Sequence, residues 1–195
     1  MAAFVTQPAP DFKADALVNG QFVENFSLSQ FKGKKVVLFF YPLDFTFVCP
    51  TEILAFSDAK AEFDARNTVV VGVSVDSKFS HWAWTQMERK DGGIKGITYP
   101  LVADLNKTIA QDYGVLLSAG VALRGLFIID ADANQSIRHI TINDLPLGRN
   151  VEEALRILDA IDFSNEHGEV CPANWKKGDK AFKPTFDGLK AFSSK

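Results

Sequence analysis

Two cysteines, Cys49 and Cys171, are the only thiols in this chain, and the position of the first suggests chemistry. Cys49 follows the apolar run 36–41 and the loop-like segment 42–48, and an amphipathic stretch begins at Ile53. This order predicts a thiol at the N-terminus of a helix, where free N–H groups and the helix dipole stabilise a thiolate. A thiolate is a nucleophile, so the site predicts redox or nucleophilic chemistry. The alternative is a buried structural cysteine.

The neighbours of Cys49 fit an activated thiol. Thr46 lies three residues before it, and across a tight loop its hydroxyl could face the sulfur and donate a hydrogen bond. Pro42 has no N–H and could shield the pocket from water. As alternatives, Thr46 is an ordinary loop residue and Pro42 ends a strand.

Glu52 stands where a C-x-x-C motif would have its second cysteine, which argues against a general disulfide oxidoreductase. A thiol that resolves an oxidised Cys49 must therefore come from elsewhere, and Cys171 is the only candidate. The alternative is that Cys171 is a second, inert thiol.

The elements expected to position Cys49 are a strand and a helix. Residues 36–41 read as a continuous apolar strand buried on both faces. A helix is expected from about residue 50 to 66, with Pro50 at its first position and Cys49 at or next to the N-cap. Its mostly apolar face comprises Ile53, Phe56, Ala59, Lys60 and Phe63.

The rest of the chain alternates between strands and helices. A hairpin is expected around Asn19-Gly20, strands at 69–75, 99–103, 126–130 and 137–142, and helices at 77–90, at 107–113 and from Asn150. The pattern predicts an α/β fold with a central mixed sheet flanked by helices. We expect a catalytic domain over 1–163 and a C-terminal arm over 164–195 that carries Cys171.

The composition excludes several classes of protein. The net charge is −3 and no basic stripe is present, so we expect no nucleic-acid partner. No apolar run is long enough to span a membrane, and residues 1–8 do not resemble a secretory signal, so we expect a cytoplasmic protein. The three histidines show no metal-ligand spacing and are assigned ordinary surface or packing roles; we expect neither a metal nor a bound cofactor.

Several motifs together resemble the typical two-cysteine subfamily of peroxiredoxins. Pro42-x-x-x-Thr46-x-x-Cys49-Pro50 is similar to the family's peroxidatic motif. The segments RGLFIID at 124–130, NDLPLGR at 143–149 and HGEVCPANW at 167–175 also match, in the family's order. The resemblance covers the chain from about Pro8 to Phe192 and implies a thioredoxin-like fold and a thiol-dependent peroxidase.

The resemblance also implies a role for each site residue. Cys49 would attack the O–O bond of hydrogen peroxide or an organic hydroperoxide and become a sulfenic acid. Thr46 would hydrogen-bond the peroxide and the thiolate, Arg124 would stabilise the developing charge, and Pro42 would close the pocket.

Two further residues, Glu52 and Arg149, would orient Arg124. Cys171, from the other subunit of a homodimer, would form the resolving disulfide after the first turn of the helix unwinds. Thioredoxin or a similar dithiol protein would then reduce that disulfide, and the dimers could assemble into a ring of five. A chaperone or peroxide-signalling role is a second possibility.

Overoxidation of Cys49 to a sulfinic acid competes with that unwinding. Sensitive members of the family carry a Gly-Gly-Leu-Gly loop and a C-terminal Tyr-Phe pair. Here the loop reads GGIKG at 92–96 and the tail reads Ala191-Phe192. Lys95 and Ala191 depart from that pattern, so we expect resistance to overoxidation.

Overall fold

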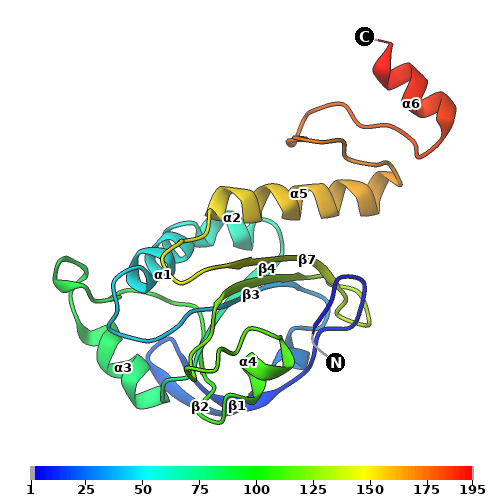
Figure 1. Ribbon diagram of the computed structural model, residues 1–195. Helices are drawn as coiled ribbons and strands as arrows, with labels where there is room; N and C mark the ends of the chain where they lie inside the picture. Colours follow the sequence, from blue (N-terminus) through cyan, green and yellow to red (C-terminus); the bar gives the residue numbers. More distant parts are fainter. Residues whose placement is uncertain (1–2, 195) are drawn as a thin grey trace. The chain divides into compact units, whose positions relative to one another are not determined.

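The computed structural model describes residues 3–194, which form two compact units (Figure 1). The first unit ends at Val151 and the second begins at Glu152. The predicted domains instead divide after residue 163. Each unit is described by itself below.

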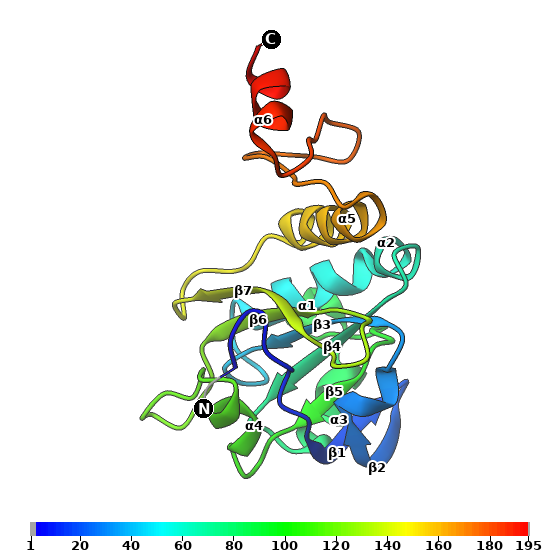
Figure 2. The ribbon, with the colours of Figure 1, turned by 90° about the vertical axis from the view of Figure 1, so that its right-hand side faces the viewer.

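The first unit is built on one mixed sheet of seven strands within the described residues, in the order β2-β1-β5-β4-β3-β6-β7 (Figure 2). The strands are β1 (Lys13–Val18), β2 (Gln21–Ser27), β3 (Lys35–Phe40), β4 (Thr68–Ser74), β5 (Leu101–Ala103), β6 (Arg124–Ile129) and β7 (Ile137–Asn143). The predicted α/β class and mixed sheet are therefore confirmed. The hairpin is confirmed too, and its turn residues Asn19 and Gly20 have φ values of 48° and 76°.

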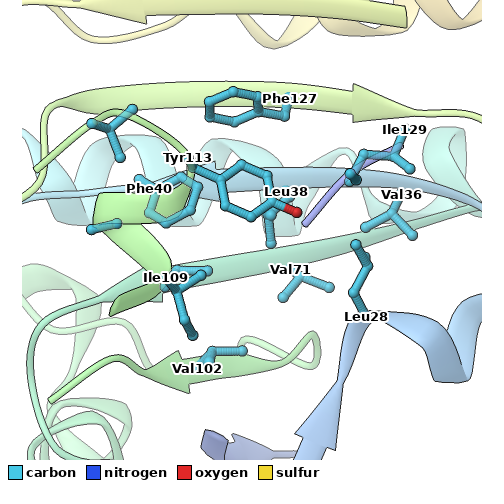
Figure 3. Packing of buried hydrophobic residues seen from close by; sticks show 14 of the residues in the cluster. Leu28, Val36, Leu38, Phe40, Val71, Val102, Ile109, Tyr113, Phe127 and Ile129 are labelled. Carbon is cyan, nitrogen blue, oxygen red and sulfur yellow. The ribbon is translucent and has the colours of Figure 1, made fainter. Parts of the chain in front are cut away.

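Strand β3 lies in the middle of the sheet, and all six of its residues are buried. It pairs in parallel with β4 and antiparallel with β6. Val36, Leu38 and Phe40 point to one face, where Figure 3 shows them among side chains of β4, β5, β6 and the helix α4. Because β3 is fixed on both edges and both faces, the loop that leaves its C-terminal end starts from a rigid point.

Helices cover both faces of this sheet. On the first unit they are α1 (Cys49–Asp58), α2 (Lys60–Asp64), α3 (Lys78–Gln86) and α4 (Thr108–Asp112), with short 3₁₀ turns at Leu28–Phe31 and Arg89–Asp91. Phe39 stacks on Phe56 of α1 with ring centroids 4.7 Å apart, whereas Phe40 packs 5.2 Å from Tyr113, directly after α4. Figure 1 shows α1 and α4 on the opposite faces that these contacts require.

The helix expected over 50–66 is in fact two helices, because Ala59 leaves helical geometry between α1 and α2. Val48 is the N-cap and Cys49 the first helical residue, so Pro50 stands one position later than predicted. The predicted buried face holds at Ile53, Phe56 and Phe63. Cys49 is next to the N-cap, as the sequence predicts.

The second unit contains α5 (Val151–His167) and α6 (Phe186–Ser193). Helix α5 begins directly after Asn150, as predicted, whereas α6 was not predicted, because its segment shows weak periodicity. Between them, Trp175 packs 5.1 Å from the ring of Phe163, and Arg156 donates to the Trp175 carbonyl. The arm therefore has structure of its own.

Candidate active site

Cys49 is fully buried at the start of α1, reached from β3 through the loop 41–48. The N-cap Val48 offers no side chain to accept a hydrogen bond from the first turn. Phe45 in the same loop has a φ of 56°, an uncommon conformation for a bulky residue. The thiol thus lies at a helix N-terminus without a side-chain cap, where the helix dipole favours negative charge.

Arg124, the first residue of β6, brings a guanidinium to the sulfur. Its Nη1 donates to Cys49 Sγ at 3.4 Å, and its Nε donates to the carbonyl of Leu145 at 2.6 Å. The side chain is 4% exposed, so water screens this interaction little. In this position the Arg124 guanidinium stabilises a thiolate, and it can also donate a hydrogen bond to an oxygen that approaches the sulfur.

Glu52, one turn into α1, links two arginines. Its Oε2 accepts from Arg124 Nη1 at 2.6 Å, and its Oε1 accepts from Arg149 Nε at 2.7 Å and from the Arg149 backbone N–H at 2.9 Å. All three side chains are almost completely buried. The carboxylate therefore holds Arg124 in the orientation that faces the sulfur.

Arg149 is fixed from several further sides. Its Nη1 donates to the carbonyls of Phe40 and Gly125 at 2.8 Å and 2.6 Å, and its guanidinium lies 5.2 Å from the ring centroid of Phe39. Within the described residues its Nη2 has no hydrogen-bond partner. The contacts tie Glu52 to the carboxyl end of β3.

Thr46 and Pro42 lie in the same loop, but the hydroxyl of Thr46 does not point as expected. It donates to the Leu43 carbonyl at 2.9 Å, and within residues 3–194 it makes no hydrogen bond to the sulfur. The loop turns back on itself at 43–46, which satisfies the carbonyl locally. Pro42 is buried directly after β3.

A buried polar cluster supports this loop from α3, and the sequence had not pointed to it. The carboxylate of Asp44 contacts His81 Nδ1 at 2.8 Å and accepts from the Tyr41 hydroxyl at 2.9 Å and from Ser80 Oγ at 2.7 Å. His81 has no exposed surface. It was assigned an ordinary surface or packing role; it is buried, and its ring also contacts the carboxylate of Asp44, 37 positions earlier in the chain.

Asp76 joins the cluster from the end of β4. It accepts from the backbone N–H of Asp44 at 2.8 Å and from Ser74 Oγ at 2.7 Å. Burial, and then the nearby charge of Asp44, raise the pKa of the Asp76 carboxyl. Burial likewise raises the pKa of Tyr41, which keeps its hydroxyl a donor. The cluster fixes the loop on which Thr46 is carried.

Cys171 lies in the second unit and is half-buried. Its thiol donates to the Ala160 carbonyl of α5, with Sγ 3.7 Å from the oxygen. Burial raises the pKa of the Cys171 thiol, and the charge of Arg156 partly opposes that shift. Both cysteines are free thiols.

Metal ligation and membrane insertion find no support in residues 3–194. This part of the chain contains no cluster of three His, Cys, Asp or Glu side chains arranged to hold a metal. Nor does any of its helices combine the length and apolar character that crossing a bilayer requires. A buried thiol that accepts a hydrogen bond from an arginine, at a helix start beside a mixed α/β sheet, is typical of a thiol-based redox enzyme.

Two family models match the chain. The AhpC/TSA family matches residues 5–140, and the C-terminal domain of 1-Cys peroxiredoxin matches residues 160–195. A thioredoxin peroxidase of Echinococcus granulosus is 54% identical over 195 residues, covering 100% of both chains. Peroxiredoxin-2 of Bos taurus is 55% identical over 194 residues, covering 99% of this chain and 96% of its own.

A solved structure agrees with these matches. The reduced 2-Cys peroxiredoxin of Plasmodium vivax has a TM-score of 0.95 at 45% identity, covering 99% of this chain and 100% of its own. The chain therefore belongs to the AhpC/TSA family of peroxiredoxins, and the predicted family and thioredoxin-like fold are confirmed. It is an oxidoreductase that reduces peroxides by thiol chemistry, as the sequence predicts.

Proposed function

We propose that Cys49 is the peroxidatic nucleophile and that Arg124 activates it. The observation that carries this is the 3.4 Å contact between Arg124 Nη1 and Cys49 Sγ. The thiolate attacks one peroxide oxygen, so an S–O bond forms as the O–O bond breaks. The other oxygen leaves as water or an alcohol after taking up one proton, and Cys49 becomes a sulfenic acid.

Thr46 then serves as an acceptor toward the substrate. Because its own proton is donated to the Leu43 carbonyl, the lone pairs of its oxygen are free to accept from a peroxide hydroxyl. Arg124 donates to the peroxide, so the two residues orient the substrate from different sides. Pro42 narrows the entrance beside them.

Cys171 of a second subunit resolves the sulfenic acid in this proposal. Its thiolate attacks the Cys49 sulfur, so an intersubunit S–S bond forms as the S–O bond breaks, and the departing hydroxide takes up one proton to become water. The peroxidatic domain over 1–163 and the arm over 164–195 thus come from different chains. Before this step the first turn of α1 must open, and the absence of a side-chain cap at Val48 keeps the cost of opening low.

The name of one relative supports a choice of reductant, and the family resemblance supports an assembly. Because a full-length relative is named a thioredoxin peroxidase, we propose that thioredoxin or a similar dithiol protein reduces the disulfide. We propose homodimers, able to assemble into a ring of five dimers, and a cytoplasmic location. Native mass spectrometry should give two or ten chains, and a monomer would contradict the assembly; cell fractionation tests the location.

The test of the site uses two matched cysteine variants. Cys49→Ser should abolish peroxide consumption, whereas Cys171→Ser should complete one turnover and then fail to be recycled by thioredoxin. Peroxide-treated wild type should run as a covalent dimer on a non-reducing gel. Peroxide consumption by Cys49→Ser near the wild-type rate, or a monomer with an intrachain bridge, would refute the assignment.

A holdase role is a second candidate because large aromatic side chains are exposed on the first unit. Phe47 is 92% exposed, Phe79 63% and Phe45 50%. Exposed apolar surface of this kind binds partners or unfolded clients. If the Cys49→Ser variant keeps a heated client protein from scattering light, the role is independent of peroxidase activity; equal scattering with and without it would eliminate that role.

A further inference from the structure

A cavity of about 440 Å³ lies in the first unit at the end of the sheet opposite to Cys49. Its walls include Lys34 before β3, Thr68 at the start of β4 and Pro100 before β5, whereas Cys49 follows the other end of β3. The volume is in the range of small-molecule sites. None of its residues belongs to the site described above.

The inner wall of the cavity is aromatic and aliphatic. The surface that a ligand can contact comes from the half-buried Phe31, Val18, Val23 and Val69, and behind it lies a packed layer of Phe26, Phe63, Val70 and Tyr99, all at least 96% buried. Such a surface accepts a flat apolar ring, because burying apolar area is the main favourable term and aromatic side chains add contact with a ring face.

The mouth of the cavity carries one uncompensated positive charge. Lys60 and Asp64 pair with each other at 2.5 Å, which leaves the ammonium of Lys34 with no ion pair or hydrogen bond within the described residues. The side chains of Gln30 and Asn19 at the rim also have no hydrogen-bond partner there. Free donors around an aromatic pocket complement an anionic group on an aromatic ring.

We propose that this cavity is a binding site for an aromatic carboxylate. The ring packs against Phe31, over the layer that contains Phe63 and Tyr99, and the carboxylate meets Lys34 and the Gln30 amide. An aliphatic anion would leave the aromatic wall unused, and a neutral ring would leave Lys34 without its counter-charge.

The site is connected to the helix that carries Cys49. The hydroxyl of Tyr99 donates to the Ile53 carbonyl, one turn after Cys49, at 2.7 Å. Phe63 lies 5.9 Å from Phe56 of α1, and Phe39 lies 5.9 Å from Tyr99. A ligand that covers the layer formed by Tyr99 and Phe63 therefore favours the folded, fixed form of α1. This coupling, unlike the binding, rests on the proposed role of Cys49.

Binding is tested first, with 2-naphthoate as the probe and 2-naphthamide as its neutral counterpart, by isothermal titration calorimetry on the reduced protein. We expect 2-naphthoate to bind the wild type and Lys34→Gln to weaken it about fivefold or more, because a charge-assisted contact is lost. Lys32→Gln, which removes an exposed lysine outside the cavity, is the matched control and should leave the affinity unchanged. No binding, equal affinity for 2-naphthamide, or equal weakening by both variants would overturn the site.

Coupling is tested by the rate at which the covalent dimer forms after one equivalent of peroxide. Saturating 2-naphthoate should slow that step about fivefold in the wild type, and at the same concentration should have little effect in Lys34→Gln. An unchanged rate would refute the coupling, while the calorimetry still decides the site. If the ligand-free wild type showed no peroxide turnover that depends on Cys49, the proposed function would be wrong instead.

Discussion

Glu52 is the residue on which both arginines of the site depend. A glutamine there has nearly the same shape but removes the charge that holds Arg124 and Arg149 together. Breaking a buried ion pair leaves buried charges uncompensated, which is costly. Glu52 therefore belongs to the reaction even though it is placed behind the arginine that contacts the sulfur.

We predict that Glu52→Gln lowers kcat/KM for hydrogen peroxide about 10²-fold, because Arg124 no longer faces the sulfur, and lowers the free energy of unfolding by about 3 kcal/mol. Stopped-flow peroxide kinetics and urea denaturation measure the two effects. Glu62→Gln, in an exposed pair with Arg66, is the control and should change stability by less than about 1 kcal/mol. Wild-type kinetics in Glu52→Gln would contradict the role.

The pKa of the Cys171 thiol should be higher in the folded protein than in the unfolded chain. Burial raises its pKa in the folded unit, so the neutral thiol persists to higher pH than in the unfolded chain, and the reactive thiolate appears as pH rises through the folded value. In Cys49→Ser, the midpoint of the iodoacetamide rate profile should lie above that of the same protein in urea. Arg156→Gln should raise it further, because the charge of Arg156 lowers the pKa.

The sequence predicts residues unequally well. Cys49 and Thr46 are close together in the chain, so their spacing makes them candidates without a structure, whereas Glu52 became a site candidate only through the family resemblance. Arg124 and Arg149 became candidates only through the family's motifs, because contacts of 72 and 97 positions to Glu52 leave no local pattern. The pairing of Asp44 with His81, 37 positions apart, was invisible for the same reason. The direction of the Thr46 hydroxyl depends on the fold of the loop itself.

At the scale of elements, contacts to neighbouring elements help to fix the loop 41–48, in addition to hydrogen bonds within the loop. Asp44 is tied to α3 through His81 and to the end of β4 through Asp76. Strand β3 was predictable because its five consecutive buried apolar residues, 36–40, are typical of a central strand. Helix ends were less predictable: the break at Ala59 and the end of α3 at Gln86, before the predicted end at residue 90, were both missed.

Removing the imidazole that pairs with Asp44 should loosen that loop. We predict that His81→Ala lowers the free energy of unfolding by about 3 kcal/mol, because it removes one hydrogen-bond partner of a buried carboxylate and opens a cavity. Urea titration measures it. Gln86→Ala, at an exposed position of the same helix, should cost less than about 0.5 kcal/mol, and equal costs would show that Asp44 does not need His81.

At the scale of the whole molecule, the balance between resolution and overoxidation decides how the enzyme survives peroxide. In the loop 88–96, Arg89 donates to the Lys95 carbonyl at 3.1 Å, and Lys95 pairs with Glu88. In the tail, Ala191 lies on α6 beside Phe192, whose ring contacts Phe182 at 4.9 Å. Lys95 and Ala191, the two residues that differ from the sensitive pattern, are thus exposed and can be substituted without disturbing the core.

We predict that the double variant Lys95→Gly with Ala191→Tyr is overoxidised at severalfold lower peroxide than the wild type during turnover with thioredoxin. Restoring the glycine and the tyrosine should help keep the first turn of α1 folded. Mass spectrometry of the Cys49 peptide counts the sulfinic acid. Lys90→Gly is the control, and a double variant as resistant as the wild type would show that these two positions do not set sensitivity.

The two arginines that share Glu52 have a consequence for timing. Arg124 and Arg149 bring two positive charges to a buried cluster that contains one carboxylate, so a thiolate at Cys49 brings the charge there to zero. A sulfenic acid carries no such charge. The reaction would therefore remove one of the two negative charges that balance Arg124 and Arg149. The repulsion between the two arginines would then be less compensated after oxidation than before it. Oxidation of Cys49 would thus weaken an electrostatic attraction that favours the closed first turn of α1, at the step at which that turn has to open.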